Sequence, residues 1–293
     1  MPPSFAHTRI LLGVPNVAVR SALRMALHSH GYRAIGDTGN FVALHDLLQT
    51  EPPDLLITAA EIDHNDTGYL VREIRNQRLG GNPFVVVLLL LATADPEAVK
   101  LAIDCGADDL MLMPVAPAAL LARIDKLSRA RKPFIATHDY IGPDRRGQAR
   151  PGPHSAPTME PPNPLAARLT NGADTTRLDA DIRAAAVRLN DMKVERMAAQ
   201  AAWLVNTIVA GVRDGMAEGD LLPHVQNLPP VAEDILARIA GGPSESHAGI
   251  VGQLLDQARQ LEAAPASISA TKLEQLQQTT IMMVRTVTRR QAS

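Results

Sequence analysis

The chain has 293 residues, of which 46% are hydrophobic and only 3% aromatic, and its formal net charge is −2. A charge this close to zero gives no basic field that would hold nucleic acid or an anionic membrane. A single cysteine excludes an intramolecular disulfide and a multi-cysteine metal site. The longest apolar run, residues 83–92, is roughly half as long as a membrane span. We therefore expect a cytoplasmic protein with no membrane segment and no nucleic-acid partner.

Residues 9–132 alternate short apolar runs with segments of helical spacing. Apolar runs bounded by helix breakers are typical of buried parallel strands, and apolar residues at every third or fourth position indicate helices. The expected strands are residues 10–12, 34–36, 55–59, 84–91 and 110–112. The expected helices are residues 17–30, 41–48, 68–76, 96–105 and 117–131. Five such βα units predict an α/β domain at residues 1–132, a doubly wound parallel sheet of flavodoxin-like order.

Residues 133–174 differ in composition from what precedes them, because eight prolines crowd into this stretch with Gly, Ser and His. Such a composition predicts an extended, disordered linker that buries no core. Within it, the sequence leaves open whether residues 133–150 dock on the neighbouring domain. The apolar residues that favour docking are Phe134, Ile135, Tyr140 and Ile141.

From Thr175 onward the pattern is helical throughout, which indicates a separate domain at residues 175–293. An apolar stripe of heptad spacing opens it, through Leu178, Ile182, Ala185, Leu189 and Met192. The expected helices are residues 176–217, 230–240, 246–263 and 269–290, with Gly219 and Pro223 ending the first. Four amphipathic helices with short connections predict an all-α helical bundle, or a hairpin completed by a second chain.

Three stretches of the first domain resemble one family. The residues from Arg9 to Leu23 resemble its first strand and helix, and Pro53-Asp-Leu-Leu-Ile-Thr resembles its third strand. The most specific match is residues 105–114, Cys-Gly-Ala-Asp-Asp-Leu-Met-Leu-Met-Pro, which is similar to the family's Ala-Gly-Ala-Asp-Asp-Tyr-Leu-Thr-Lys-Pro. The family is the receiver domain of response regulators, the phosphoacceptor module of two-component signalling. The resemblance covers less than half of the chain.

The resemblance implies a definite chemistry for a working receiver. Two acidic residues after the first strand help to hold Mg²⁺, and an Asp at the end of the third strand is the nucleophile. A Thr or Ser ends the fourth strand, and a Lys precedes the proline after the fifth. Mg²⁺ prefers oxygen ligands in octahedral geometry, and the metal and the lysine offset charge on the transferring phosphoryl group.

This sequence departs from the family's pattern at these positions. Val14 and Pro15 stand in place of the acidic pair, Ala59 in place of the nucleophile and Met113 in place of the lysine. The hydroxyl position corresponds to Leu91 or Thr93, and the aromatic switch residue of the family's fifth strand corresponds to Leu110. An alanine cannot accept a phosphoryl group, and a pocket without carboxylates cannot hold Mg²⁺ tightly. The departures predict a pseudo-receiver that keeps the fold and loses phosphotransfer, with no catalytic residue, bound metal or cofactor.

The resulting prediction is a non-enzymatic signalling adaptor in a two-component or phosphorelay pathway. It would act by protein–protein contact through its fourth and fifth βα units, where Leu110 and Pro114 lie and where the family's usual partner surface is found. The expected partners are a histidine kinase, a chemotaxis protein or another signalling component. A homodimer through residues 175–293 is also expected.

Other functions stay open on the sequence alone. The chain could be an active response regulator phosphorylated at a displaced aspartate, Asp63 or Asp66, with a helical output domain. It could be a phosphotransfer protein that uses His247, or a structural oligomer in which the receiver is a spacer. Glu61, Asp63 and Asp66 could also form a small cation site, although a solvated acidic loop is the simpler interpretation.

Overall fold

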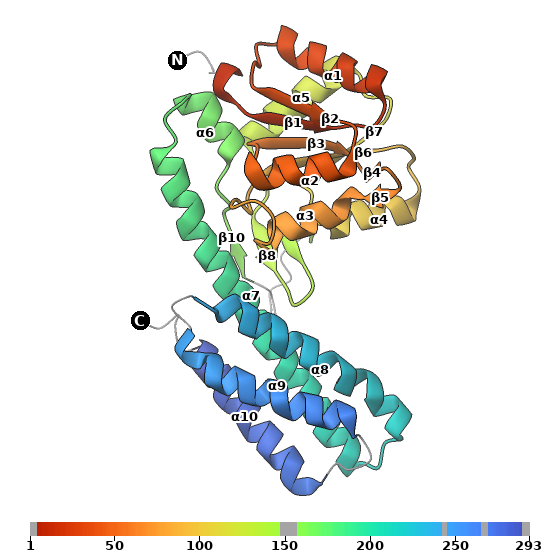
Figure 1. The fold of residues 1–293 in the computed structure, drawn as a ribbon, viewed down its shortest axis with the longest axis vertical. Coiled ribbons are helices and arrows are strands. Elements are labelled where there is room, and N and C mark those ends of the chain that lie inside the picture. The colour runs from red at the N-terminus through yellow and green to blue at the C-terminus, as the bar shows by residue number, and fades with distance from the viewer. Residues whose placement is uncertain (1–4, 147–156, 242–244, 265–268, 289–293) are drawn as a thin grey trace. The chain divides into compact units, whose positions relative to one another are not determined.

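A five-stranded parallel sheet organises the N-terminal part of the protein (Figure 1). The computed structural model describes residues 5–146, 157–241, 245–264 and 269–288. The chain divides into two units, residues 1–189 and 190–293. The strands are β1 (Ile10–Gly13), β2 (Ile35–Thr38), β3 (Leu55–Ala59), β6 (Val86–Leu91) and β7 (Asp109–Leu112), and they lie in the order β2-β1-β3-β6-β7. This order confirms the predicted flavodoxin-like sheet.

Helices cover both faces of this sheet, as its fully buried central strands require. Helices α1 and α5 share one apolar core with the sheet, and α2, α3 and α4 share the other. Their bounds are α1 Val17–Ser29, α2 Phe41–Thr50, α3 Thr67–Arg75, α4 Pro96–Asp104 and α5 Pro117–Arg129. A short 3₁₀ helix, η1 (Phe5–His7), precedes β1. The side chains of Asn16, Asn40, Asp66 and Asp95 cap the N-termini of the first four helices.

The stretch predicted as a disordered linker is largely structured, which corrects that prediction for its described residues. It forms an antiparallel sheet of β8 (Phe134–Ala136), β9 (Ile141–Pro143) and β10 (Thr158–Met159), followed by helix α6 (Pro164–Asn171). We call residues 131–146 and 157–171 the docked extension. The first compact unit accordingly continues to residue 189 and does not end at 132.

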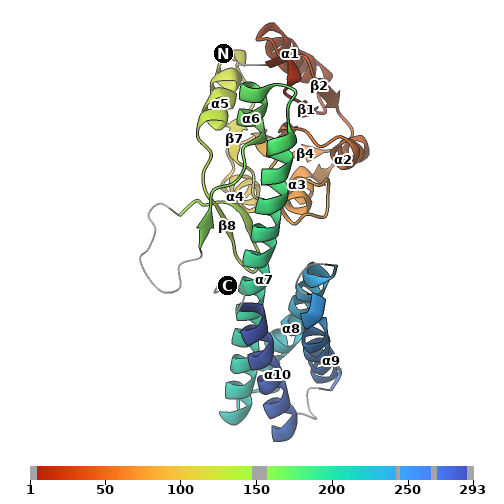
Figure 2. The same cartoon turned by 90° about the vertical axis from the view of Figure 1, so that its left-hand side faces the viewer.

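The apolar residues singled out in the extension explain why it is ordered. Phe134, Ile135 and Ile141 are buried, which confirms the docking for the described part of 133–150; residues 147–150 lie outside the described residues. Pro164 stands in the first turn of α6, where no backbone N–H is needed. Leu165 of α6 is fully buried in the core shared with α1 and α5, and Figure 2 shows α6 beside α5.

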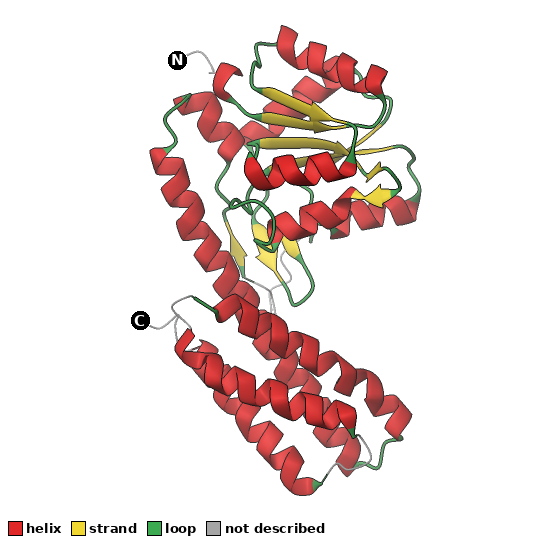
Figure 3. Cartoon of the chain, viewed as in Figure 1, coloured by secondary structure: helices red, strands yellow, loops and turns green. Residues whose placement is uncertain are grey.

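The second unit is helical throughout its described residues (Figure 3). Its elements are α7 (Thr176–Arg213, which begins in the first unit), α8 (Glu218–Ile239), η2 (Glu245–His247), α9 (Ala248–Ala263) and α10 (Ala270–Thr288). Buried residues of α7, α8, α9 and α10 form one apolar core. No helix within the described ranges has the length and apolar character needed to span a membrane.

Two helix boundaries in this unit were predicted wrongly. Helix α7 ends at Arg213 rather than at 217, and Gly215 with φ +70° follows it. Helix α8 begins at Glu218 rather than at 230, and it runs through Pro223, Pro229 and Pro230. A proline inside a helix costs about 3 kcal/mol, but the buried stripe continues across these prolines. Its members are Leu221, Val225, Leu228, Ala232, Ile235 and Ile239.

Candidate functional site

The residues that correspond to the family's phosphorylation pocket gather at the carboxyl edge of the sheet. Ala59 ends β3 and is 4% exposed, and Leu91 ends β6 and is also buried. Val14 follows β1 and donates its backbone N–H to Thr38 at 2.9 Å. Met113 follows β7 and donates its N–H to Leu91 at 2.8 Å. The structure thus brings four of the six pocket positions to one edge, while Pro15 and Thr93 are exposed in the loops beyond it.

The hydroxyl groups beside Ala59 already have acceptors on the backbone. Thr58 Oγ1 donates to the carbonyl of Gly13 at 3.0 Å, and Thr67 Oγ1 donates to the carbonyl of Ala59 at 2.6 Å. Both threonines are fully buried. Among the described residues there is no group of three or more His, Cys, Asp or Glu side chains that could hold a metal ion. Around Ala59 the edge is therefore lined by buried apolar side chains and by threonine hydroxyls bonded to the backbone.

A guanidinium group occupies the edge beside β1, which the sequence did not reveal. Arg20 donates to the carbonyls of Val14 and Pro15, the latter at 3.2 Å. Its Nε donates to Asp37 at 3.0 Å, and the side chain is 17% exposed. A divalent cation at this point would meet a fixed positive charge and carbonyl oxygens that are already bonded. The only indication of this role in the sequence is that Arg20 follows shortly after Val14 and Pro15, the positions of the acidic pair.

The two aspartates of the alternative hypothesis each stabilise the start of a helix. They lie in the hairpin of β4 (Glu61–Ile62) and β5 (Asn65–Asp66). Asp63 Oδ2 accepts hydrogen bonds from the backbone N–H of Phe41 at 2.9 Å and from Asn40 Nδ2 at 3.0 Å, at the N-terminus of α2. Asp66 caps α3 by accepting from Gly68 N at 2.8 Å, and it pairs with Arg72 at 2.9 Å. Carboxylates in such positions favour helix N-termini.

The fourth and fifth βα units present apolar side chains to solvent. Leu101 on α4 is 59% exposed and Leu112 on β7 is 50% exposed. β7 is the edge strand, so one of its sides has no neighbouring strand in the sheet. Leu110 is half-buried and Pro114 is exposed. We call this surface of α4 and β7 the α4–β7 face. The sequence indicated Leu110 and Pro114 but not the two exposed leucines, because family motifs mark strand ends rather than surface positions.

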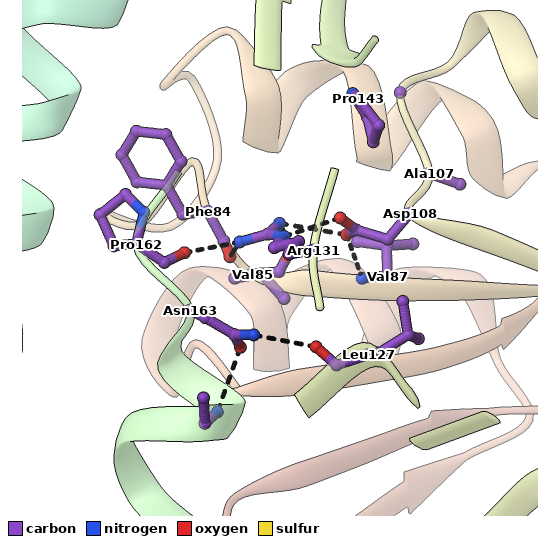
Figure 4. Close-up of polar contacts among 12 residues, drawn as sticks. Phe84, Val85, Val87, Ala107, Asp108, Leu127, Arg131, Pro143, Pro162 and Asn163 are labelled. Carbon is purple, nitrogen blue, oxygen red and sulfur yellow. Dashed lines mark hydrogen bonds and ion pairs between the residues drawn. The ribbon is translucent and has the colours of Figure 1, made fainter. Parts of the chain in front are cut away.

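A second polar centre lies at the opposite, amino edge of the sheet (Figure 4). Asp108, in the turn before β7, is buried and pairs with Arg75 of α3 at 2.9 Å and with Arg131 of the docked extension at 2.7 Å. It also accepts from the backbone N–H of Val87 at 2.8 Å. Burial raises the pKa of Asp108, but Arg131 and Arg75 outweigh this effect and hold it below its ordinary value. Burial lowers the pKa of Arg75 to about 10, although Asp108 opposes the change.

The two arginines of this centre bind the docked extension to the sheet. Arg131 donates to the carbonyls of Phe84 and Pro162, each at 2.7 Å. The Phe134 ring lies within reach of both guanidinium groups, with its centroid 4.8 Å from Cζ of Arg131 and 5.1 Å from Cζ of Arg75. Desolvated contacts of a cation with an aromatic face are favourable. The centre therefore joins α3, β6 and the docked extension.

A similar pairing anchors α6 to the start of β3. Asp54 is buried, accepts from the backbone N–H of Arg9 at 2.8 Å and pairs with Arg168 at 3.3 Å. Asp54 immediately precedes β3, so it lies at the end of that strand opposite to Ala59. His247, the other candidate phosphoacceptor, precedes α9 in the helical unit and is half-buried, with Nδ1 lacking a hydrogen-bond partner among the described residues.

Comparisons with known proteins assign the N-terminal part of the chain. No family model matches the chain. The response regulator MprA of Mycobacterium tuberculosis (strain H37Rv) is 31% identical over 126 residues, which is 43% of this chain and 52% of that protein. MprA of Mycobacterium leprae is 30% identical over 125 residues, 43% of this chain and 53% of its own. The chain thus spans about half the length of the curated relatives it matches.

Receiver domains also appear among the solved structures similar to this one. A CheY-like receiver domain from Methanospirillum hungatei has 19% identity and a TM-score of 0.38, covering 41% of this chain and 93% of its own. The chemotaxis response regulator CheY4 of Vibrio cholerae has 18% identity and a TM-score of 0.38, covering 41% of this chain and 98% of its own. The N-terminal residues, about 125 of them, match response-regulator receiver domains, and the C-terminal helical half has no recognised family.

Proposed function

We propose that the N-terminal part of this chain, which matches response-regulator receiver domains, is a pseudo-receiver, a signalling adaptor that works without accepting phosphate. The observation that carries the proposal is Ala59, a buried methyl group at the end of β3 where a working receiver needs a carboxylate. A methyl group offers no lone pair for attack on a phosphoryl donor.

The surroundings of Ala59 support the same proposal. The corresponding pocket positions after β1, at the end of β6 and after β7 carry Val14, Leu91 and Met113, so that apolar side chains stand in place of the carboxylates, the hydroxyl and the ammonium group of a working receiver. The guanidinium group of Arg20 already donates hydrogen bonds to backbone carbonyl groups and to Asp37. The alternative acceptors Asp63 and Asp66 hold helix N-termini, and phosphorylation of either would remove a cap.

The adaptor would act by protein contact, and the α4–β7 face is the surface proposed for it. Its exposed leucines, Leu101 and Leu112, offer apolar area beside the exposed charged side chains of Glu97, Lys100 and Asp104. Exposed apolar groups of this kind mark candidate protein contacts when they cluster. A histidine kinase or another component of a two-component pathway is the proposed class of partner. We also propose that the protein is cytoplasmic and that it forms a homodimer through residues 175–293.

The experiment that tests the proposal is treatment of the intact protein with acetyl phosphate and Mg²⁺, followed by mass spectrometry of the whole chain. The expected result is no added phosphoryl group, while a conventional receiver treated in parallel gains one. A phosphoryl group mapped to an aspartate would overturn the proposal. The variants Asp63→Asn and Asp66→Asn identify the acceptor in that case, because loss of the signal in one of them establishes the active-regulator alternative.

A further inference from the structure

The turn that joins α4 to β7, residues 105–108, is covered by the docked extension. Gly106 has φ +91°, a conformation that favours glycine, and it faces β9 across a very short distance. A Cβ on Gly106 would collide with the carbonyl oxygen of Ile141, and a Cβ on Gly142 would lie 2.7 Å from Cα of Gly106. Only two glycines facing each other allow the backbone of β9 to approach this turn so closely.

Polar contacts hold the same turn residue by residue. Arg75 of α3 donates to the carbonyl of Gly106 at 2.9 Å. From the docked extension, Arg145 donates to the carbonyl of Ala107 at 2.6 Å, and Arg131 donates to both carboxylate oxygens of Asp108, at 2.7 and 3.1 Å. Charge-assisted bonds of this length are strong, and most of these atoms are removed from water. The conformation of the turn therefore depends on the extension being docked.

The turn is also the connection between the two elements of the α4–β7 face. It follows the last residue of α4, Asp104, and leads directly into β7 at Asp109. The turn is therefore the covalent connection through which the docked extension would act on Leu101 of α4 and Leu112 of β7. On the carboxyl side of the same strand, the residue that corresponds to the family's lysine is Met113, which packs against the apolar core.

We propose that the docked extension controls the α4–β7 face: docking holds the turn 105–108 in one conformation, and undocking releases it. The part of this inference that concerns partner binding rests on the proposed function of that face. The control needs no phosphoryl group, because its contacts lie at the amino edge of the sheet. Docked and undocked arrangements of the hairpin would be the two states that such a switch requires.

The test is hydrogen exchange of the full chain carrying Gly142→Ala. The φ of Gly142 is not in the left-handed region, so the substitution acts through steric clashes rather than through backbone strain. Its methyl group would lie 2.5 Å from the Tyr140 hydroxyl oxygen and 2.7 Å from Cα of Gly106. We expect amides of the turn and the end of α4 to exchange roughly tenfold faster, with β1 and β3 unchanged. The matched control is Gly81→Ala, because a Cβ at Gly81 meets nothing within 4 Å.

A second variant keeps the test decisive if Gly142→Ala disturbs the whole first unit. Arg145→Ala removes the bond to Ala107 and is compared with Arg146→Ala, whose guanidinium pairs with Asp144 outside the turn. Faster exchange in the turn for Arg145→Ala alone supports the inference. Unchanged exchange in the turn for both Gly142→Ala and Arg145→Ala overturns it. A phosphoryl group found on the chain would overturn the adaptor proposal but would leave this exchange result standing.

Discussion

The carboxyl and amino edges of the five-stranded sheet bury different kinds of side chain. The carboxyl edge, where the family's chemistry takes place, is closed by apolar residues such as Ala59 and by an internally bonded arginine, Arg20. The amino edge holds the buried ionic centre of Asp108 with Arg75 and Arg131. Charged groups are costly to bury unless they are paired. Their concentration at the amino edge indicates that the docked extension is part of the working structure rather than a tether.

The largest effect that follows from this comparison is expected for Asp108→Asn. The substitution keeps the shape of the side chain but leaves two buried guanidinium groups without their counter-charge, which costs about 3–5 kcal/mol. The matched control is Asp109→Asn, which breaks a partly exposed pair with Arg123 (2.6 Å) and costs up to about 1 kcal/mol. Native-state hydrogen exchange in β6 and β7 measures both within the first unit. Equal losses for the two variants would contradict the assignment of the buried Asp108 centre as the anchor of the docked extension.

Acid dependence provides a second measurement on the same group. The pKa of Asp108 is lowered in the folded protein from 3.8, so its carboxylate contributes stability that is fully present above that value. This contribution is lost as the pH falls through the lower folded-state pKa. We therefore expect the wild type to lose more free energy of unfolding than Asp108→Asn between about pH 4 and pH 2. Parallel pH profiles for the two proteins would show that Asp108 is not preferentially ionised in the fold.

A smaller loss is expected when the apolar anchor of the extension is shortened. Leu165 is fully buried against the core of α1 and α5, so Leu165→Ala removes transfer energy and leaves a cavity, at about 3 kcal/mol. Leu112→Ala is the matched control, because Leu112 is half exposed and its truncation changes stability by no more than roughly 0.5 kcal/mol. Exchange in α5 and α6 reports the difference. A Leu165→Ala protein as stable as Leu112→Ala would show that α6 is not held to the sheet.

The smallest effect is expected at the acidic loop of the carboxyl edge. Asp66→Ala removes the N-cap of α3 and its pair with Arg72, at about 1 kcal/mol. Asp66→Asn keeps a capping oxygen and should lose less, which distinguishes a capping role from a purely ionic one. Exchange of the first turn of α3 measures both variants. A larger loss in Asp66→Asn than in Asp66→Ala would refute the capping role.

The sequence was sufficient for the parts of the molecule that depend on local patterns. Apolar runs and helix caps placed the five strands and five helices of the parallel-sheet domain. The Cys-Gly-Ala-Asp-Asp motif placed Leu110 within the last strand and Met113 just after it, where the structure has them. The residues of such a motif lie within one βα unit, so their positions relative to the strand are determined locally. Local pattern therefore predicts both the fold and the positions that correspond to the family's pocket.

The parts that the sequence missed depend on partners far along the chain. Asp54 and Arg168 are 114 residues apart, and nothing in either neighbourhood indicates the pairing. The prolines of residues 133–174 predicted disorder, because a flexible linker buries no side chains. Phe134 and Leu165 are nevertheless buried in apolar surroundings. Helix α8 shows the same effect, because its buried stripe outweighs the cost of its internal prolines.

Control of the turn 105–108 and of α4 from the amino edge, rather than from the carboxyl edge, is tested by hydrogen exchange of these segments in the full chain under two perturbations. One perturbation is acetyl phosphate with Mg²⁺, which acts at the carboxyl edge in a working receiver, and the other is Gly142→Ala, which acts at the amino edge. The account predicts no change with the phosphodonor and faster exchange with the substitution. A response to the phosphodonor together with indifference to Gly142→Ala would contradict it.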